Sequence, residues 1–203
     1  LYIAGFRGIF VALEEITTSG QYIPDINLFL NETFFNGTVN GVQNSILLGT
    51  TYNDMLVAIN SKARKINVDV EMGNASLEII QEDPWNVKFV LTSDFLMKDR
   101  EGLAQWNKTQ VVSTKVSITN FEDPIYVVNL APRKINQTIY EGNYVYSGDF
   151  TNLSLHLDGQ YYAQHDDAPS FLQRIEGNLS ANPDGNGIES FVRFPDEEKS
   201  VVD

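Results

Sequence analysis

The first twenty residues carry an apolar pattern with the spacing of a helix. Five large apolar side chains follow one another at intervals of four, three, four and three residues, which places them on a single helical face. These residues, called the seam residues below, are Tyr2, Phe6, Ile9, Leu13 and Ile16. Gly20 follows them as a typical C-terminal cap. The pattern predicts a helix over 1–20.

Two interpretations of this helix stay open. In one, it is a core helix beneath a sheet, because further apolar residues on its other faces require covering on more than one side. In the other, it is the outer half of a membrane-anchored helix. The run is too short to cross a bilayer by itself, and the sequence begins with Leu1 rather than Met, so a membrane-spanning part would precede it. The seam residues would then mediate self-association.

The middle of the chain changes from a helical period to a period of two. Residues 21–50 are rich in Asn, Gly and aromatic side chains and predict loops and turns. A second helix is predicted over 53–66, behind a cap at Thr51 or Asn53. Polar and apolar residues then alternate, which indicates antiparallel strands. The predicted strands are 68–72, 77–79, 87–93 and 111–119, with a short β-branched strand at 125–129.

The C-terminal part gives a mixed pattern. Residues 140–165 fit either a strand or a helix, and the stripe Phe150, Leu153, Leu157 and Tyr161 favours the helix. A further helix is predicted behind Asp167 and ends at Gly177.

Together these patterns predict an α+β fold, in which an N-terminal helix and a second helix pack on an antiparallel meander of about four to six strands. A smaller helical C-terminal portion follows. The predicted organisation is an N-terminal helix over 1–20 and an α+β domain over 21–203.

Composition excludes several classes of protein. The 203 residues include no cysteine, so there is no disulfide framework, cysteine nucleophile or thiolate metal site. A net charge of −13 argues against nucleic acid as the main partner, because phosphate binding needs basic patches. We read this acidity as a solubility feature.

Asparagine-linked glycosylation sequons (Asn-x-Ser/Thr) are several times more frequent than chance predicts. Nineteen asparagines and twenty-five Ser or Thr residues should give about two sequons by chance, and the sequence has seven. Their asparagines are Asn31, Asn36, Asn74, Asn107, Asn136, Asn152 and Asn178. This excess predicts N-linked glycans over much of the surface, and hence a location at the cell surface or outside the cell.

Two polar clusters contain residue types that bind metal ions. His165, Asp166 and Asp167, with His156 nearby, offer ligand types suited to zinc, although Asp167 is better explained as a helix cap. The segment 182–189 begins like a calcium loop, but Arg193 stands where such a loop needs its bidentate acid. We therefore predict no cofactor and no metal ligands. A calcium ion near Asp184 is the alternative.

The sequence contains no motif of a known catalytic centre. It has neither a nucleophile elbow nor a phosphate-binding glycine loop, so we predict no catalytic residues and a non-enzymatic protein. An alternative is a ligand- or carbohydrate-binding ectodomain with an aromatic pocket. The pocket would lie near Trp85, near Trp106 or near the pair Tyr161 and Tyr162. A secreted hydrolase is a weaker alternative.

Three segments carry a resemblance to a protein group. They are ALEEITTSG at 12–20, FEDPIYVVN at 121–129 and APSFLQRIEGNLS at 168–180. With these segments the chain resembles uncharacterised archaeal cell-surface proteins that have a type IV pilin-like N-terminal helix and an N-glycosylated ectodomain. The resemblance implies a filament subunit or a membrane-anchored ectodomain in adhesion or surface assembly. It implies self-association through the N-terminal helix or anchoring upstream of residue 1, and it implies no catalytic residues.

Overall fold

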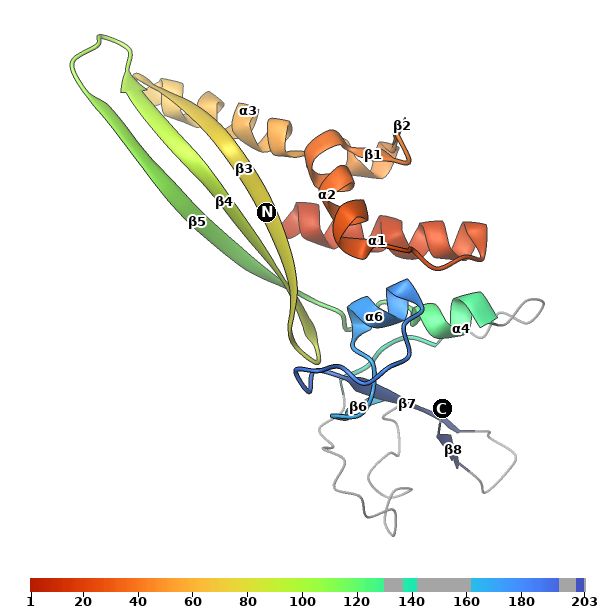
Figure 1. Ribbon diagram of the computed structural model, residues 1–203. Helices are drawn as coiled ribbons and strands as arrows, with labels where there is room; N and C mark the ends of the chain where they lie inside the picture. Colours follow the sequence, from red (N-terminus) through yellow and green to blue (C-terminus); the bar gives the residue numbers. More distant parts are fainter. Residues whose placement is uncertain (130–136, 142–161, 194–199, 203) are drawn as a thin grey trace. The chain divides into compact units, whose positions relative to one another are not determined.

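The computed structural model describes residues 1–129, 137–141, 162–193 and 200–202 (Figure 1). Within them the chain is a mixed α+β protein, which confirms the predicted fold class. The chain divides into two compact units. Unit 1 comprises residues 1–11, 27–80 and 88–116. Unit 2 comprises residues 12–26, 81–87 and 117–203.

Helices and strands both occur along most of the described chain. The α-helices are α1 (Tyr2–Ser19), α2 (Ile26–Asn36), α3 (Tyr52–Ala63), α4 (Pro124–Asn129) and α6 (Phe171–Glu176). The 3-10 helices are η1 (Ser45–Leu47) and η2 (Arg64–Ile66). The strands are β1 (Thr38–Val39), β2 (Val42–Gln43), β3 (Val68–Asp83), β4 (Asn86–Asp99), β5 (Gln105–Ser117), β6 (Tyr162–Gln164), β7 (Ile188–Arg193) and β8 (Ser200–Val202).

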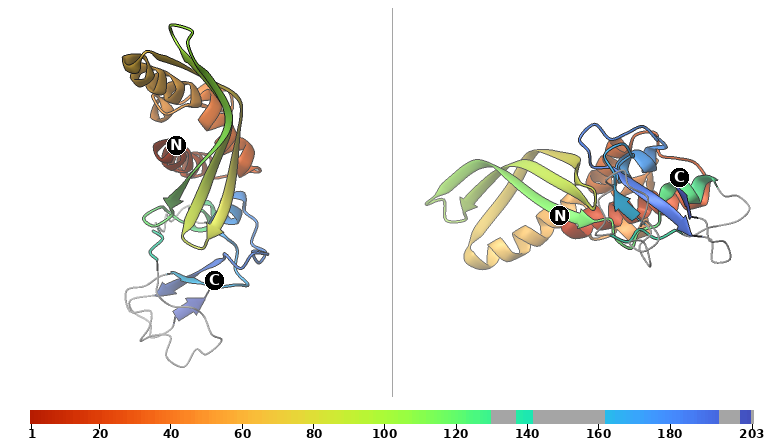
Figure 2. Two further views of the ribbon diagram at one scale, coloured as in Figure 1. Left: turned by 90° about the vertical axis from the view of Figure 1, so that its left-hand side faces the viewer. Right: turned by 90° about the horizontal axis from the view of Figure 1, so that it is seen from below.

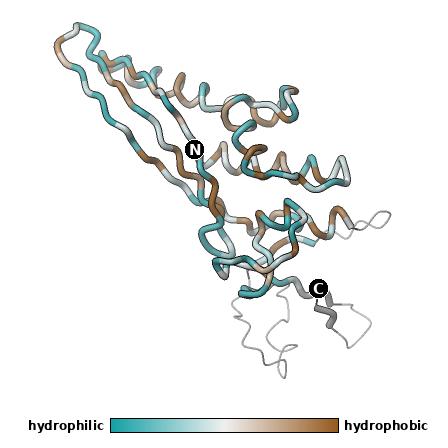
Figure 3. Tube along the Cα trace, in the orientation of Figure 1, coloured by the Kyte–Doolittle hydropathy of each residue, from teal (hydrophilic) through white to brown (hydrophobic). Residues whose placement is uncertain are grey.

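Unit 1 is built on an antiparallel sheet of three long strands in the order β3-β4-β5. Within this unit, α2, α3 and the first half of α1 lie on one side of the sheet (Figure 2). Along β4, Val87, Phe89 and Leu91 are buried and the residues between them are partly exposed. Figure 3 shows the hydropathy of each residue along the strands. The prediction of four to six strands is too high for this sheet.

Glycines let α1 approach its neighbours closely in unit 1. A Cβ atom at Gly5 would lie 2.8 Å from the ring of Phe89 on β4, and one at Gly8 would lie 3.0 Å from Leu30 on α2. Both glycines are buried. The first half of α1 therefore packs on the sheet and on α2 through its small residues.

Strand β3 changes its buried face part of the way along. Val70 and Met72 are buried in its first half, whereas Leu77 and Ile79 are buried in its second half. Asn74 lies between them with a φ of 48°, in the left-handed region that asparagine tolerates better than most residues. An extra residue of this kind reverses the side-chain alternation, as in a β-bulge, and explains why the sequence pattern suggested two separate strands.

Unit 2 contains the smaller sheet β6-β7-β8 together with α4 and α6. Tyr162 on β6 pairs with Ser190 on β7. The predicted helix before Gly177 is α6, whose N-cap is Ser170 rather than Asp167. The C-terminal portion thus has the predicted helix α6, and also a sheet that the sequence pattern did not predict. Most of 140–165 lies outside the described residues, and 162–164 form β6.

Two predicted elements are wrong. Residues 125–129 are part of helix α4, not a strand. Asp123 caps this helix by accepting a hydrogen bond from the Ile125 amide at 3.1 Å, and Pro124 suits the first helical position.

Residues 26–36, predicted as loop, form α2. The Glu176 carboxylate accepts a 3.0 Å hydrogen bond from the Ile26 amide at the start of α2.

Candidate functional site

The sequons differ in how far the fold leaves them accessible. Five of the seven lie in the described residues, whereas Asn136 and Asn152 lie outside them. Four of the five asparagines are exposed, at the end of α2, on β3, on β5 and after α6; they are Asn36, Asn74, Asn107 and Asn178. Only Asn31, within α2, is partly buried among these five.

Asn31 is held by the structure of unit 1. Its side-chain Nδ2 donates to the carbonyl of Asn27 at 2.8 Å and to that of Leu77 on β3 at 3.3 Å. The hydroxyl of Thr33, the third residue of this sequon, is 3% exposed and donates to the Leu30 carbonyl at 2.9 Å. Because a glycan is attached at Nδ2, the folded chain does not present this sequon to a transferase.

Asn178 has the opposite arrangement. It follows Gly177, which ends α6 in the left-handed conformation at a φ of 72°. The Asn178 side-chain Oδ1 accepts from both the amide and the hydroxyl of Ser180, at 3.1 and 2.6 Å. This local turn leaves the sequon exposed on the surface of unit 2 and brings its asparagine and hydroxyl together.

Two other sequons are joined at one carboxylate on the long sheet. Asp94 on β4 accepts a 2.6 Å hydrogen bond from the hydroxyl of Thr109 and a 2.8 Å bond from Nδ2 of Asn74. Thr109 is the third residue of the sequon that begins at Asn107. The hydrogen bond from Thr109, followed by that from Asn74, lowers the pKa of Asp94. The side-chain groups of both sequons therefore share an acceptor across three strands.

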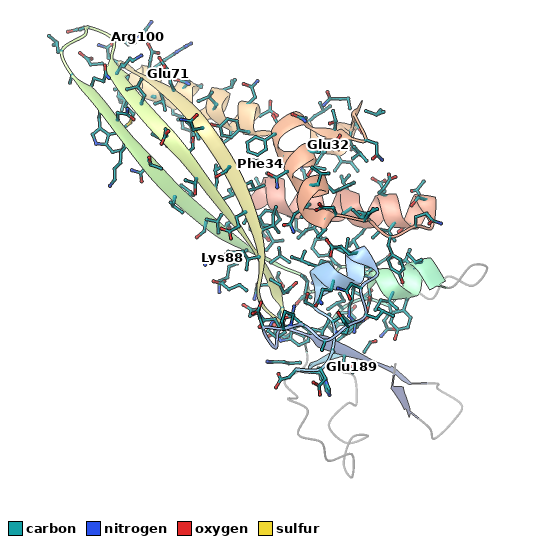
Figure 4. All side chains as sticks on the ribbon, in the orientation of Figure 1. Glu32, Phe34, Glu71, Lys88, Arg100 and Glu189 are labelled. Atoms are coloured by element: carbon teal, nitrogen blue, oxygen red, sulfur yellow. The ribbon has the colours of Figure 1, made fainter. Side chains whose placement is uncertain are left out.

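The hairpin after α2 is held by a carboxylate. Glu32, labelled in Figure 4, accepts 2.7 Å hydrogen bonds from the Thr38 hydroxyl and the Gly41 amide. Burial raises the pKa of Glu32, but these hydrogen bonds more than offset it and the net pKa is lowered. Thr38 is the third residue of the Asn36 sequon, so this carboxylate orders the chain beside an exposed asparagine.

The predicted seam residues are divided by burial. Ile9, Leu13 and Ile16 are buried, with no more than 7% exposed. Tyr2 and Phe6 are 51% and 41% exposed, and their rings stack with centroids 6.5 Å apart. The larger part of the predicted seam is therefore in the protein's own core.

The apolar surface of α1 includes two residues that the seam prediction missed. Ile3 and Phe10 are 60% and 46% exposed and lie on the same side as Phe6. We call Tyr2, Ile3, Phe6 and Phe10 the aromatic face of α1. The spacing from Ile3 to Phe6 to Phe10, three and then four residues, carried this signal in the sequence.

Arg7 interrupts the apolar N-terminal run for a structural reason. Its Nη1 donates to the carbonyls of Ile46 and Leu48, both at 3.0 Å, at the end of η1. A guanidinium can satisfy several carbonyl groups that a 3-10 helix leaves without partners. This cation therefore joins α1 to η1 within unit 1.

The polar clusters weighed as metal sites have local hydrogen-bonding roles. Asn182 Oδ1 accepts from the amides of Asp184 and Asn186, at 3.0 and 3.2 Å, which forms a tight turn. His165 Nδ1 accepts from the Asp167 amide at 3.1 Å. In the described part of the chain no three acidic, histidine or cysteine side chains are grouped as a metal site needs. His156 lies outside that part.

The aromatic residues proposed for a ligand pocket differ in their exposure. Trp85 is 9% exposed and Tyr162 is fully buried, so neither offers a ring for stacking on a ligand. Trp106 is 41% exposed, near the start of β5. Tyr161 lies outside the described residues.

A buried polar network holds unit 2 together. Arg174 on α6 and Asp123 before α4 form an ion pair at 2.6 Å, with side chains 2% and 0% exposed. The Tyr162 hydroxyl donates to the same carboxylate oxygen at 2.9 Å, and Arg174 Nη2 donates to the Ile188 carbonyl. Four segments therefore meet at this network, whose burial and pairing fit a structural role.

Comparison with known proteins gives no match. No protein-family model, no curated protein and no solved structure matches the chain. As regards membranes, no helix in the described residues is both long and apolar enough to span a bilayer.

Proposed function

We propose that this chain is a non-enzymatic, N-glycosylated protein of the cell surface, acting in adhesion or surface assembly as a pilin-like filament subunit or a membrane-anchored ectodomain. Four exposed sequon asparagines, spread over both units, carry this proposal: Asn36, Asn74, Asn107 and Asn178. An excess of sequons is informative about location only where the folded chain presents them to a transferase.

The aromatic face of α1 supports attachment as part of this function. Four large apolar side chains gathered on one helix surface are costly to leave in water. In the proposed function they are covered in the assembled state, while the buried half of the stripe, Ile9, Leu13 and Ile16, holds α1 in the fold.

Point substitutions test this attachment better than removal of the helix. Deletion of residues 1–18 would remove buried core residues and unfold the protein. The double substitution Phe6→Ser and Phe10→Ser instead changes only exposed positions. We expect it to abolish attachment to filaments or membranes while preserving the thermal unfolding midpoint within a few degrees. Unchanged attachment would remove the aromatic face from the proposal.

Glycopeptide mapping of protein from its native source tests the glycans. We expect Asn178 and Asn107 to be occupied and Asn31 to be bare, because Asn31 is partly buried with Nδ2 bonded to two carbonyls. The variant Asn178→Gln should lose the mass of one glycan, and Asn31→Gln should lose none. An intact mass equal to that of the bare polypeptide would contradict the proposed function.

A further inference from the structure

The two edges of the long sheet are treated differently by the fold. At the β3 edge, the Asn60 side chain of α3 bonds both backbone groups of Val70. Its Nδ2 donates to the carbonyl at 2.7 Å and its Oδ1 accepts from the amide at 2.8 Å. Further along, Asn31 of α2 donates to the Leu77 carbonyl at 3.3 Å. Side chains from two helices thus occupy backbone groups that a further strand would need.

Strand β5 forms the other edge of this sheet, and no described strand pairs with its outer side. It is the terminal strand of the sheet order, thirteen residues long, and nearly all of its residues are exposed. Val111 and Val112 at its centre are 64% and 47% exposed. In the described residues no helix side chain bonds the backbone of β5 from Gln105 to Ser113. A long, proline-free strand of this kind is a template for pairing with another strand.

The register against β4 identifies the backbone groups that face outward. The Asp99 amide donates to the Ala104 carbonyl at 2.9 Å, and the Ile118 amide donates to the Trp85 carbonyl at 3.0 Å. Both pairs belong to one continuous antiparallel register, in which even-numbered residues of β5 direct their N–H and C=O groups to β4. Odd-numbered residues, Val111 among them, therefore direct theirs to the free edge.

We infer that β5 pairs with β5 of a second copy of this chain, antiparallel about a two-fold axis through Val111, to give one six-stranded sheet. A second copy is the favoured occupant because the β3 edge of each copy is covered, so only β5 can meet β5. An axis through Val111 pairs Gln105 with Ser117 of the second copy and uses the whole strand. It also brings odd-numbered residues opposite odd-numbered residues, as the outward groups require.

The charges on β5 are compatible with this register. Lys108 and Lys115 are the only charged residues of the strand. Lys108 of one copy would stand opposite Lys115 of the other only if the axis passed between Val111 and Val112. In that register, residues whose N–H and C=O groups face the free edge would lie opposite residues whose groups already bond β4. With the axis on Val111, Lys108 faces Thr114 and Lys115 faces Asn107 of the second copy, so no like charges oppose each other.

Cysteine cross-linking tests the register, and the cysteine-free chain provides a clean background. Opposed residues of a hydrogen-bonded antiparallel pair have Cα atoms about 5.5 Å apart, within the range of a disulfide. We expect Val111→Cys to form a covalent dimer under a mild oxidant. Ser113→Cys alone should form about ten-fold less, since its two copies would lie roughly 14 Å apart. A mixture of Thr109→Cys and Ser113→Cys should give the mixed dimer.

Proline substitution tests the edge itself. Val111→Pro removes an outward N–H and no bond to β4, so an edge strand tolerates it. Sedimentation velocity should show a concentration-dependent dimer for the parent chain and at least about ten-fold weaker association for Val111→Pro. Val111→Thr, which keeps the N–H, is the matched control and should associate like the parent. If the proline variant is unfolded by circular dichroism, the cross-linking pattern decides.

Either of two results would overturn the inference. One is a parent chain that stays monomeric at high concentration in about 0.5 M salt, where repulsion between copies of net charge −13 is screened. The other is equal cross-linking at positions 111 and 113. All measurements use protein made without glycans. A failure of β5 pairing in these experiments therefore does not contradict the proposed surface location. Likewise, a finding that the native protein carries no glycans would not contradict the pairing of β5.

Discussion

The Asp123 carboxylate accepts a 2.6 Å hydrogen bond from the Arg174 guanidinium, with both side chains out of contact with solvent. The same aspartate caps α4 through the Ile125 amide. One acidic side chain thus orients α4 and neutralises the buried cation on α6. Removal of one partner of a buried pair leaves an uncompensated charge, which is a larger cost than the pair's net contribution to stability.

We predict that Asp123→Ala lowers the free energy of unfolding by about 3–5 kcal/mol, because Arg174 would remain buried without its counter-ion. Urea unfolding followed by circular dichroism measures this change. The control is Lys98→Ala, which removes an exposed ion pair with Glu71 and should cost at most about 1 kcal/mol. Equal losses in the two variants would show that the buried pair is not special.

Tyr162 should make stability depend on alkaline pH. Burial, and then the neighbouring Asp123 carboxylate, raise its pKa far above the usual range. The folded protein therefore keeps the phenol protonated, whereas an unfolded tyrosine ionises near pH 10. The stability from this group is fully present below about pH 10 and is lost as the pH rises further, by up to about 1.4 kcal/mol per pH unit.

The variant Tyr162→Phe separates this effect from other alkaline titrations. At pH 8 it should be less stable than the parent by about 1.5–3 kcal/mol, because a hydrogen bond to a buried carboxylate is lost. By pH 11 the difference should shrink, since only the parent has an ionisable group at this position. The control Tyr140→Phe, at an exposed position, should leave the stability at pH 8 unchanged. A pH-independent gap for Tyr162→Phe would refute the assignment.

Gly5 should be intolerant of any side chain. In most helices an alanine in place of glycine gains up to about 1 kcal/mol. Here the new Cβ would lie 2.8 Å from ring carbons of the buried Phe89, and such overpacking costs about 1–3 kcal/mol. We therefore expect Gly5→Ala to lower the thermal unfolding midpoint. Gly73→Ala, whose Cβ would enter open space, should not; a stabilised Gly5→Ala would contradict the close packing.

Asn60 should protect the sheet as well as stabilise it. Asn60→Ala leaves the amide and carbonyl of Val70 without their side-chain partners and should cost about 1–2 kcal/mol. The uncovered β3 edge should also allow association beyond a dimer, which light scattering detects. The neighbouring exposed Ser61→Ala serves as the control and should change neither quantity. Normal stability and size for Asn60→Ala would show that α3 covers this edge without its help.

Local patterns predicted the elements whose signals are local. Helix α1, helix α3 and the long strands follow from periodicity, and the helix ending at Gly177 from its capping residue. The β-branched run at 125–129 misled the prediction because Asp123 and Pro124 start a helix there, and capping outweighs a weak strand propensity. Helix α2 was missed because its asparagines suggested a loop, although Ile26, Leu30 and Phe34 keep a helical spacing and are buried.

Features that depend on the tertiary fold were beyond the sequence pattern. Periodicity showed an apolar stripe on α1, but only packing determines that Ile9 is buried and Phe10 exposed. A sequon count treats Asn31 and Asn178 alike, and only the hydrogen bonds of the fold distinguish them. Likewise, alternation predicted a strand near 111–119 without indicating that it forms the edge of a sheet.

The covered β3 edge has a consequence for the size of any assembly made through the sheet. A protomer with two open edges adds copies without end and grows into cross-β fibrils. A protomer with one open edge has no unpaired edge strand left after it has paired once. By holding Val70 and Leu77 with asparagines, α3 and α2 thus make strand pairing self-terminating. In the function proposed above, the protein would then reach high local concentrations without forming amyloid.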